Sequence, residues 1–173
     1  MAQISSNKAM KRLNGYAFLC LLVFLWAGCQ SCASKEAFQE GANLFDQGVR
    51  LLNAGEQIQA IGYFDKLIAR EPNNAQAYRN KGLAEYQLGR LSDAKRDVNV
   101  ALKIDPQLGS AYVNRGDIQS DLGDNVPAIA DYSAALALLP RAGDVYNARG
   151  NVYCKLSKFQ EALSDFNREI QLD

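Results

Sequence analysis

Residues 75–108 read AQAYRNKGLAEYQLGRLSDAKRDVNVALKIDPQL, and residues 109–142 read GSAYVNRGDIQSDLGDNVPAIADYSAALALLPRA. The two stretches align without insertion or deletion, and the same register continues on both sides of them. Three columns carry it: Gly48, Gly82, Gly116 and Gly150; Ala60, Ala94, Ala128 and Ala162; and Pro72, Pro106 and Pro140. A shift of 34 residues therefore superimposes the chain on itself after residue 40, which predicts four units: 41–74, 75–108, 109–142 and 143–173.

Each unit is predicted to fold as two helices. In the second unit the first helix covers Ala75–Leu88 and ends at Gly89, because a glycine after a helical run is a common C-terminal stop. The second helix covers Ser92–Ile104 and ends before Pro106, since proline excludes the helical region for the residue that precedes it. The glycine and alanine columns lack bulk where the two helices of one pair must approach closely.

These columns resemble the tetratricopeptide repeat (TPR) family, a helix–turn–helix repeat of 34 residues. The resemblance rests on YxNxG at Tyr78–Gly82, YVNRG at Tyr112–Gly116, AIADYSAAL at Ala128–Leu136 and EALSDF at Glu161–Phe166. It covers residues 41–173 and implies an all-α, right-handed solenoid of four TPR units. The chain departs from the family pattern at Gln47, Lys81, Glu85 and Gln119.

Charged residues recur in two of the columns. Cations occupy one position of the first helices, and aspartates occupy one position of the second helices: Lys81, Arg115 and Arg149, with Asp97, Asp131 and Asp165. Antiparallel packing of the helices brings the two columns together. We therefore expect structural, partly buried ion pairs that tie the helix pairs together, in preference to a charged ligand site.

The resemblance implies a concave surface, lined by the first helices, that binds an extended peptide or a helix of a partner protein. The lining residues include Phe45, Val49, Leu52, Arg79, Asn80, Leu83, Tyr86, Asn114, Asp117 and Asn151. The first half of this groove is apolar and the second half is polar. We expect hydrophobic anchoring in the first half and hydrogen bonds from asparagine side chains to a peptide backbone. In the alternative interpretation, residues 35–40 cover Phe45, Val49 and Leu52.

One TPR subclass grips the C-terminal carboxylate of chaperones with a Lys/Asn/Asn/Lys/Arg set. Asn80 and Asn114 match the middle of that set. The remaining positions carry Phe45 or Arg79, Val49 or Leu83, and Ser110 or Asp144, depending on the register. Carboxylate clamping of this kind is therefore not expected.

The N-terminus is predicted to be a signal peptide. Lys8, Lys11 and Arg12 precede the uncharged run YAFLCLLVFLW of residues 16–26, and small residues follow at Ala27 and Gly28. A basic segment, a short apolar segment and a small-residue exit are typical of secretory signals. The apolar run is too short for a membrane-spanning helix, which needs about 20 residues.

Two cleavage sites fit this N-terminus. Residues 25–29 (LWAGC) resemble a bacterial lipobox, which implies a signal peptide at 1–28 and lipidation of Cys29, although Trp26 departs from the motif. Gln30, directly after the cysteine, resembles the residue at this position in proteins sorted to the outer membrane. The expected location is therefore the cell envelope, lipid-anchored to the outer membrane on its periplasmic side, with a tether or short lead-in helix at 29–40. Cleavage after Ala33 is the alternative, and it implies a periplasmic or secreted protein.

Composition excludes several functional classes. The chain has 173 residues, 19 Lys and Arg, 19 Asp and Glu, and no histidine. Balanced charge does not point to nucleic acid, and the absence of histidine removes His-activated nucleophiles and His-based metal sites. We expect no enzyme, no cofactor and no metal. Cys154 is expected to be a small buried hydrophobe without a disulfide.

The last helix leads to an alternative interpretation in which the protein associates with itself. The chain reaches Asp173 without the capping helix that repeat arrays usually need. Leu163, Phe166 and Ile170 are then partly exposed and available to a second copy.

Overall fold

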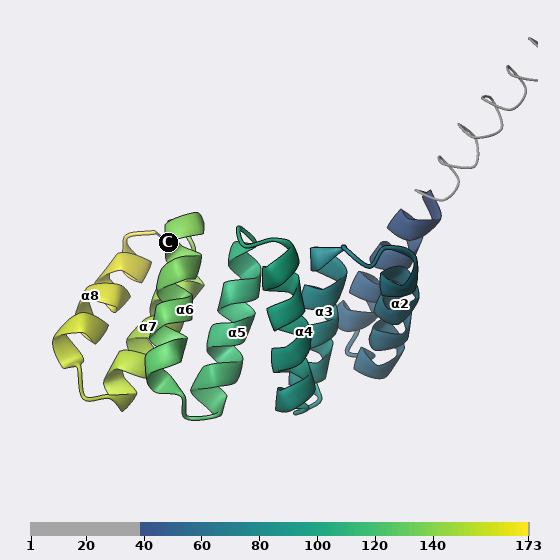
Figure 1. The fold of residues 1–173 in the computed structure, drawn as a ribbon. Coiled ribbons are helices and arrows are strands. Elements are labelled where there is room, and N and C mark those ends of the chain that lie inside the picture. The colour runs from purple at the N-terminus through teal and green to yellow at the C-terminus, as the bar shows by residue number, and fades with distance from the viewer. Residues whose placement is uncertain (1–38, 173) are drawn as a thin grey trace, which may run out of the picture. The chain divides into compact units, whose positions relative to one another are not determined.

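The computed structural model describes residues 39–172 (Figure 1). The chain divides into two units, Met1–Ala42 and Asn43–Asp173, and the description below concerns the second. The predictions for the signal peptide, for Cys29 and for the cleavage sites lie outside the described residues. Of the stretch 29–40, only residues 39 and 40 are described, and both are helical.

The described residues form helices joined by short turns, with no strand among them. A helix over 39–53 is followed by α2 (Gln57–Arg70), α3 (Ala75–Gln87), α4 (Leu91–Ile104), α5 (Gly109–Asp121), α6 (Asn125–Leu138), α7 (Gly143–Lys155) and α8 (Phe159–Ile170). The helices from α2 to α8 follow one another in chain order along the array (Figure 1). The predicted all-α solenoid of helix–turn–helix repeats is confirmed, and the predicted helix ends of the second unit agree within one residue.

The turn inside each helix pair has a fixed geometry. Gly89 has φ of 72°, and the N–H of the following Arg90 donates to the carbonyl of Glu85 at 2.9 Å. This hydrogen bond, from an N–H to the carbonyl five positions earlier, is that of the Schellman motif at a helix C-terminus. The motif requires a residue with a left-handed backbone conformation. Glycine supplies that residue in the first three turns, and Ser157, with φ of 58°, supplies it in the fourth.

The glycine column allows the two helices of a pair to touch. A Cβ atom on Gly82 would lie 2.7 Å from the Cγ2 of Val98, and one on Gly116 would lie 2.7 Å from the Cε1 of Tyr132. Gly48 and Gly150 meet Phe64 and Phe166 in the same way. The predicted close approach is confirmed, and its partner is the large residue found 16 positions later in each unit.

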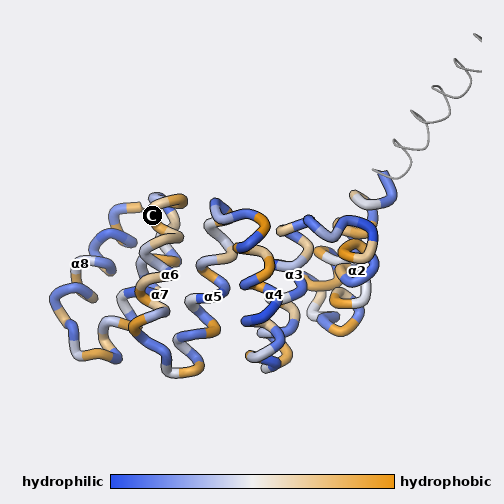
Figure 2. The backbone as a smooth tube through the Cα atoms, in the orientation of Figure 1, coloured by the Kyte–Doolittle hydropathy of each residue, from blue (hydrophilic) through white to orange (hydrophobic). Residues whose placement is uncertain are grey.

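The core is a series of layers between successive helix pairs. One cluster joins Val98 and Leu102 of α4 to Ala111 and Ile118 of α5. Equivalent clusters join α6 to α7 and the helix 39–53 to α2 and α3. Figure 2 shows hydrophobic residues recurring along the helices of the array. Each unit therefore buries apolar surface both between its own two helices and against its neighbours, as solenoids do.

Candidate functional site

The first helices of the units form one continuous surface. α3 contacts α5 and α5 contacts α7, whereas the second helices α4, α6 and α8 make no such contact with each other. The side of the array on which successive helices approach is the inner side of its curvature. We call the surface formed by α3, α5 and α7, together with residues 43–53 in the same register, the inner face. The predicted groove residues all belong to these helices.

Polar bonds connect successive helices across the inner face. The hydroxyl of Tyr86 donates to Asp121 at 2.7 Å, and the ammonium of Lys155 donates to the Ser120 hydroxyl at 2.8 Å. Each bond joins residues 35 positions apart, which places its ends on neighbouring first helices. The helices of the inner face are therefore joined by side-chain hydrogen bonds as well as by packing, and we describe such a surface as braced.

Arg79 is the centre of a third polar connection. Its Nη1 donates to Asn80 Oδ1 at 2.8 Å, and its Nε donates to the side-chain oxygen of Asn114 at 3.2 Å in the amide orientation that satisfies both of its ends. Burial lowers the pKa of the Arg79 guanidinium, and no carboxylate pairs with it among the described residues. Asn80 and Asn114 are 5% and 7% exposed. The side chains of these two asparagines accept hydrogen bonds from Arg79. Their burial differs from the expectation that they lie open and bond to a peptide backbone.

The apolar half of the predicted groove belongs largely to the core. Leu52 is buried in a cluster with Phe64, and Phe45 meets Phe64 edge-on with ring centroids 6.2 Å apart. Val49 and Leu83 are half-buried against the same cluster. This part of the inner face offers only the outer edges of these side chains. Cover by residues 35–38, the alternative interpretation, lies outside the described residues.

The polar half is more open. Asn151 is exposed and donates to Asn147 Oδ1 at 2.8 Å. Asp117 is half-buried and accepts a bond of 2.7 Å from the hydroxyl of Tyr132, while burial raises its pKa. Cys154 is a free thiol and is exposed, so the prediction that it is buried is wrong. The error has a physical reason: position 154 lies on the inner face of α7, outside the layer between α6 and α7.

The cation and aspartate columns lie side by side. Arg115 Nε and Nη2 donate to the two carboxylate oxygens of Asp131, both at 2.7 Å. The same two atoms of Arg149 donate to the carboxylate oxygens of Asp165, both at 2.8 Å. The three aspartates of this column are buried, whereas the cations are partly exposed. These bonds join the two helices of one pair. The expectation that they tie one pair to the next is therefore wrong for these bonds alone.

The tie between pairs comes from a second partner of each cation. Arg115 Nη1 donates to Asn99 at 2.9 Å, and Arg149 Nη1 donates to the hydroxyl of Ser133 at 2.8 Å. Both partners lie 16 residues before the cation, on the second helix of the preceding unit. This acceptor column was not predicted from the sequence, although its members recur every 34 residues: Asp65, Asn99 and Ser133.

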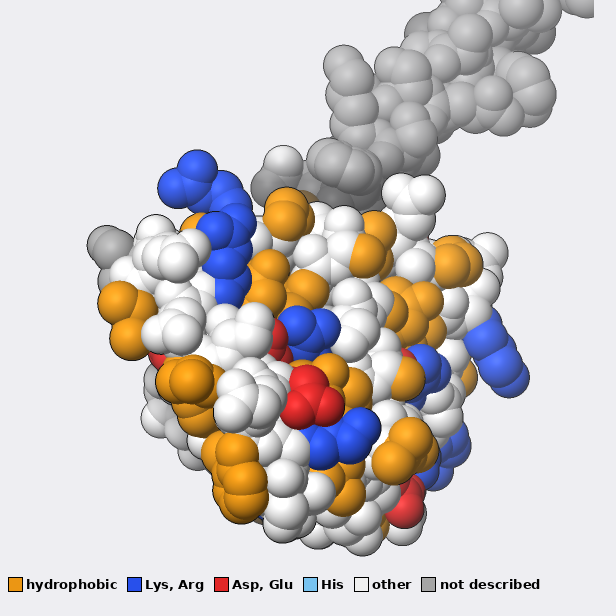
Figure 3. All heavy atoms as spheres, turned by 90° about the vertical axis from the view of Figure 1, so that its left-hand side faces the viewer, with side chains coloured by type: hydrophobic (Ala, Val, Ile, Leu, Met, Phe, Trp, Pro, Cys, Tyr) orange, Lys and Arg blue, Asp and Glu red, His pale blue; other side chains and the backbone are white. Residues whose placement is uncertain are grey.

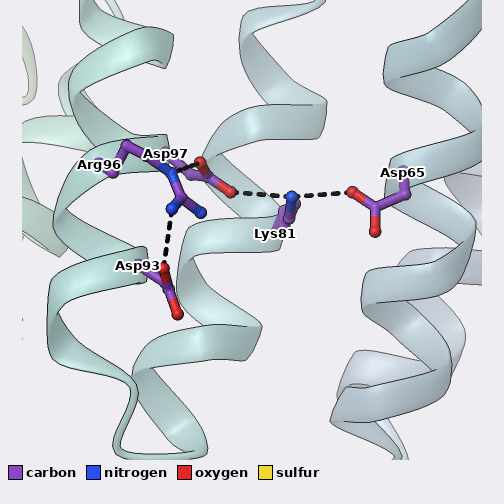
Figure 4. A network of polar contacts seen from close by, with 5 residues as sticks. All are labelled: Asp65, Lys81, Asp93, Arg96 and Asp97. Atoms are coloured by element: carbon purple, nitrogen blue, oxygen red, sulfur yellow. Dashed lines mark hydrogen bonds and ion pairs between the residues drawn. The ribbon is translucent and has the colours of Figure 1, made fainter.

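Each cation thus bridges an acceptor on the preceding second helix and the aspartate of its own pair, and we call this arrangement a cation ladder. Figure 4 shows the first ladder, formed by Asp65, Lys81 and Asp97. The ammonium of Lys81 lies 2.8 Å from Asp65 and 3.1 Å from Asp97, and Arg96 Nε lies 3.1 Å from the other oxygen of Asp97. Burial acts to lower the pKa of Lys81, but its bonds to the two carboxylates raise it. The carboxylate of Asp97 is thus shared between two cations.

Glu85 is a buried acid beside this ladder. Its side chain is 5% exposed and its Oε2 has no hydrogen-bond partner. Desolvation, followed by the nearby charge of Asp97, raises the pKa of Glu85 to about 7. The following unit carries the uncharged Gln119 in the same column.

Two features are absent from residues 39–172. None of the helices described there has the length and apolarity needed to cross a membrane. The described side chains also include no group of three or more His, Cys, Asp or Glu residues arranged to hold a metal ion.

Comparison with known proteins agrees with the fold. The tetratricopeptide repeat family model matches residues 45–109 and 107–173. A curated protein of Fusarium oxysporum f. sp. lycopersici, the tetratricopeptide repeat and J domain-containing co-chaperone DNJ1, is 35% identical over 65 residues. That match covers 38% of this chain and 12% of the co-chaperone, so the chain spans about an eighth of that relative.

Solved structures share the architecture at low sequence identity. MamA residues 41-end from Desulfovibrio magneticus RS-1 has a TM-score of 0.69 at 20% identity, with 77% of this chain and 75% of that chain covered. The first TPR of Spaghetti (RPAP3), bound to the HSP90 peptide SRMEEVD, has a TM-score of 0.66 at 24% identity, with coverage of 69% and 94%. The Arabidopsis OM64 TPR domain has a TM-score of 0.66 at 23% identity, with coverage of 69% and 98%. At these identities the likeness concerns the fold alone.

Proposed function

The chain belongs to the tetratricopeptide repeat family, whose repeats bind peptides and protein partners, and we propose that it is a non-catalytic scaffold of the bacterial cell envelope. In this proposal the inner face binds a peptide or a helix of a partner protein. The observation that carries it is the bracing of α3, α5 and α7 by bonds between residues 35 positions apart. A braced surface loses little conformational freedom when a partner binds, which favours affinity.

The chemistry of the inner face indicates the kind of partner. Arg79 supplies a half-buried positive charge that no described carboxylate neutralises, so an acidic side chain of the partner complements it. Leu83 and Tyr86 add half-buried apolar surface beside it, and Asn151 adds an exposed amide farther along the array. We expect the partner to carry an acidic residue next to an apolar one.

A matched pair of variants tests this binding face. Asn151→Glu places a carboxylate on the inner face, where it repels an acidic partner, whereas Ser164→Glu places the same group on the outer side of α8, and both positions are exposed. Peptides selected by display on the full chain are titrated against both variants. We expect Asn151→Glu to weaken binding about tenfold or more and Ser164→Glu to leave it unchanged. Equal effects of the two variants would argue against the inner face.

The envelope location is proposed from the N-terminal pattern. Lipidation of Cys29 anchors the chain in this proposal, with the repeats outside the lipid phase. The intact mass of the processed protein, taken from membrane and soluble fractions, tests it. A membrane species that begins at Cys29 with added lipid mass supports the proposal, and Cys29→Ala removes that mass. A soluble species that begins at Ser34 instead supports a periplasmic or secreted adaptor.

A co-chaperone-like role is the second candidate function. It is favoured by the relative named a co-chaperone and by the RPAP3 domain solved with an HSP90 peptide. The peptide SRMEEVD is the direct probe. Saturable binding of this peptide at micromolar concentration supports the co-chaperone-like role. We expect no such binding, because the flanking residues of a carboxylate clamp are absent from this chain.

A further inference from the structure

The helix α8 presents an apolar stripe to solvent. Phe159, Leu163, Phe166 and Ile170 lie within one arc of about 60° at 100° per residue, and Asn167 borders it. Phe159, Leu163 and Ile170 are 65%, 54% and 71% exposed. Figure 3 looks at the side of the array on which α8 lies and shows hydrophobic side chains at this surface, interspersed with charged ones. Phe166 packs against Gly150 of α7, whereas no described residue covers Phe159, Leu163 or Ile170.

The position of Ile170 is also apolar on the earlier second helices α4 and α6, and there it is covered. Position 170 of α8 corresponds to Leu136 of α6 and Leu102 of α4. Those two leucines are 7% and 8% exposed, because the first helix of the next unit packs on them. Asn167 corresponds to Ser133 and Asn99, and each of these accepts a hydrogen bond from the arginine of that next helix. The side chain of Asn167 makes no hydrogen bond with the described residues.

The covering helices share one pattern. Each places a cation between two apolar residues, four positions after the first and three positions before the second. The three examples are Ala77, Lys81 and Ala84 of α3; Ala111, Arg115 and Ile118 of α5; and Val145, Arg149 and Val152 of α7. These apolar residues are buried, and the cation reaches the acceptor on the preceding second helix.

We propose that the stripe on α8 docks an amphipathic helix of a partner protein that carries an Arg or Lys between two aliphatic residues at this spacing. Three internal interfaces of the same chain supply the template for this contact. The cation is expected to bond to Asn167, and the aliphatic residues are expected to cover Ile170 and Leu163. This surface is separate from the inner face, so the proposal does not rest on peptide binding there.

A second copy of this chain does not fit the template. Its first helix carries Asn43, Gln47 and Arg50 at the three positions of the pattern. Asn43 and Arg50 are exposed and polar, and they would have to be buried against Leu163 and Ile170. Burial of polar groups without partners is costly. Head-to-tail stacking of copies is therefore disfavoured.

The probe for the test is a stapled helical peptide with the sequence of residues 107–122, labelled with a fluorophore and titrated into the full chain in detergent. We expect a Kd of about tens of micromolar, typical of a small interface. Leu163→Asp combined with Ile170→Asp should weaken binding by about tenfold or more. The matched control is Ile58→Asp, which changes an apolar residue of similar exposure, 69%, at the other end of the array.

The peptide itself is also varied, because changing the probe cannot unfold the protein. A peptide with Gln in place of the arginine should bind the wild type about fivefold more weakly than the arginine peptide does. The two peptides should bind the Asn167→Ala variant equally well. Binding that survives the double aspartate variant, or that is lost equally with Ile58→Asp, would overturn the proposal. So would the absence of any saturable binding to the wild type. Growth of the scattering mass to a dimer that the double variant abolishes would assign the stripe to a second copy instead.

Discussion

Replacing Glu85 with glutamine should remove a loss of stability that the wild type suffers as pH rises from about 4.5 to about 7. The side chain is 5% exposed, lies near Asp97 and leaves one oxygen without a hydrogen bond. Its pKa is raised from 4.5 to about 7 in the folded chain. The folded state therefore holds this proton at pH values at which the unfolded state has already released it. Stability consequently falls as pH rises from about 4.5 to about 7, and it levels off above that range.

The size of the effect follows from the shift. A difference of about 2.5 pKa units at 1.36 kcal/mol each corresponds to about 3 kcal/mol of unfolding free energy. Glutamine has nearly the same shape and no charge, and Gln119 already occupies the equivalent column one unit later. The Glu85→Gln variant should thus match the wild type at about pH 4 and exceed its stability by about 2 to 3 kcal/mol at about pH 8.

Urea unfolding followed by far-ultraviolet circular dichroism at several pH values measures this difference. Comparing the variant with the wild type cancels the contribution of other titrating groups such as Asp117, whose pKa is also raised by burial. Glu161→Gln, an exposed position on α8, is the control for the substitution itself. If the stability difference between Glu85→Gln and the wild type does not change with pH, the argument from burial and neighbouring charge is refuted.

Three further substitutions test the packing by urea unfolding. Arg115→Met should cost about 3 kcal/mol, because it strands a buried aspartate and removes the tie to the preceding unit; a loss below about 1 kcal/mol would contradict this. Gly116→Ala should cost about 1 to 3 kcal/mol through its clash with Tyr132, whereas Gly62→Ala, where a Cβ meets nothing within 4 Å, should add about 1 kcal/mol. Equal effects would refute the steric argument. Ser157→Gly should add about 1 kcal/mol by relieving a left-handed residue, and a loss of stability would oppose it.

The helix pairs and their closest contacts could be predicted from the sequence because both partners recur in the same unit. The glycine and its large partner, such as Gly116 and Tyr132, are separated by 16 residues in all four units, and the cation and its aspartate, such as Arg115 and Asp131, by 16 residues in the last three. A fixed separation across a fixed turn brings the same columns together each time. The pairing of columns is then a geometric consequence of the repeat.

The candidate site was harder to predict because its contacts cross from one unit to the next and their chemistry changes. The acceptors of the cations are an aspartate, an asparagine and a serine, so the column does not read as one residue type. Arg79 occurs in one unit alone and recruits Asn80 and Asn114 into its own hydrogen bonds. Repetition carries no information about such single events, and the packing of side chains decides them.

The two sets of bonds between units give the array a mechanical property. Bonds spaced by 35 residues lie on the inner face, and the cation ladders connect successive second helices through the first helix between them. Opening the curvature strains the first set, and sliding one unit past the next strains the second. A pull applied between the two ends of the array is therefore carried by short polar links in series. The array should therefore resist small extensions stiffly, and under a larger force the bonds between units should break one junction at a time.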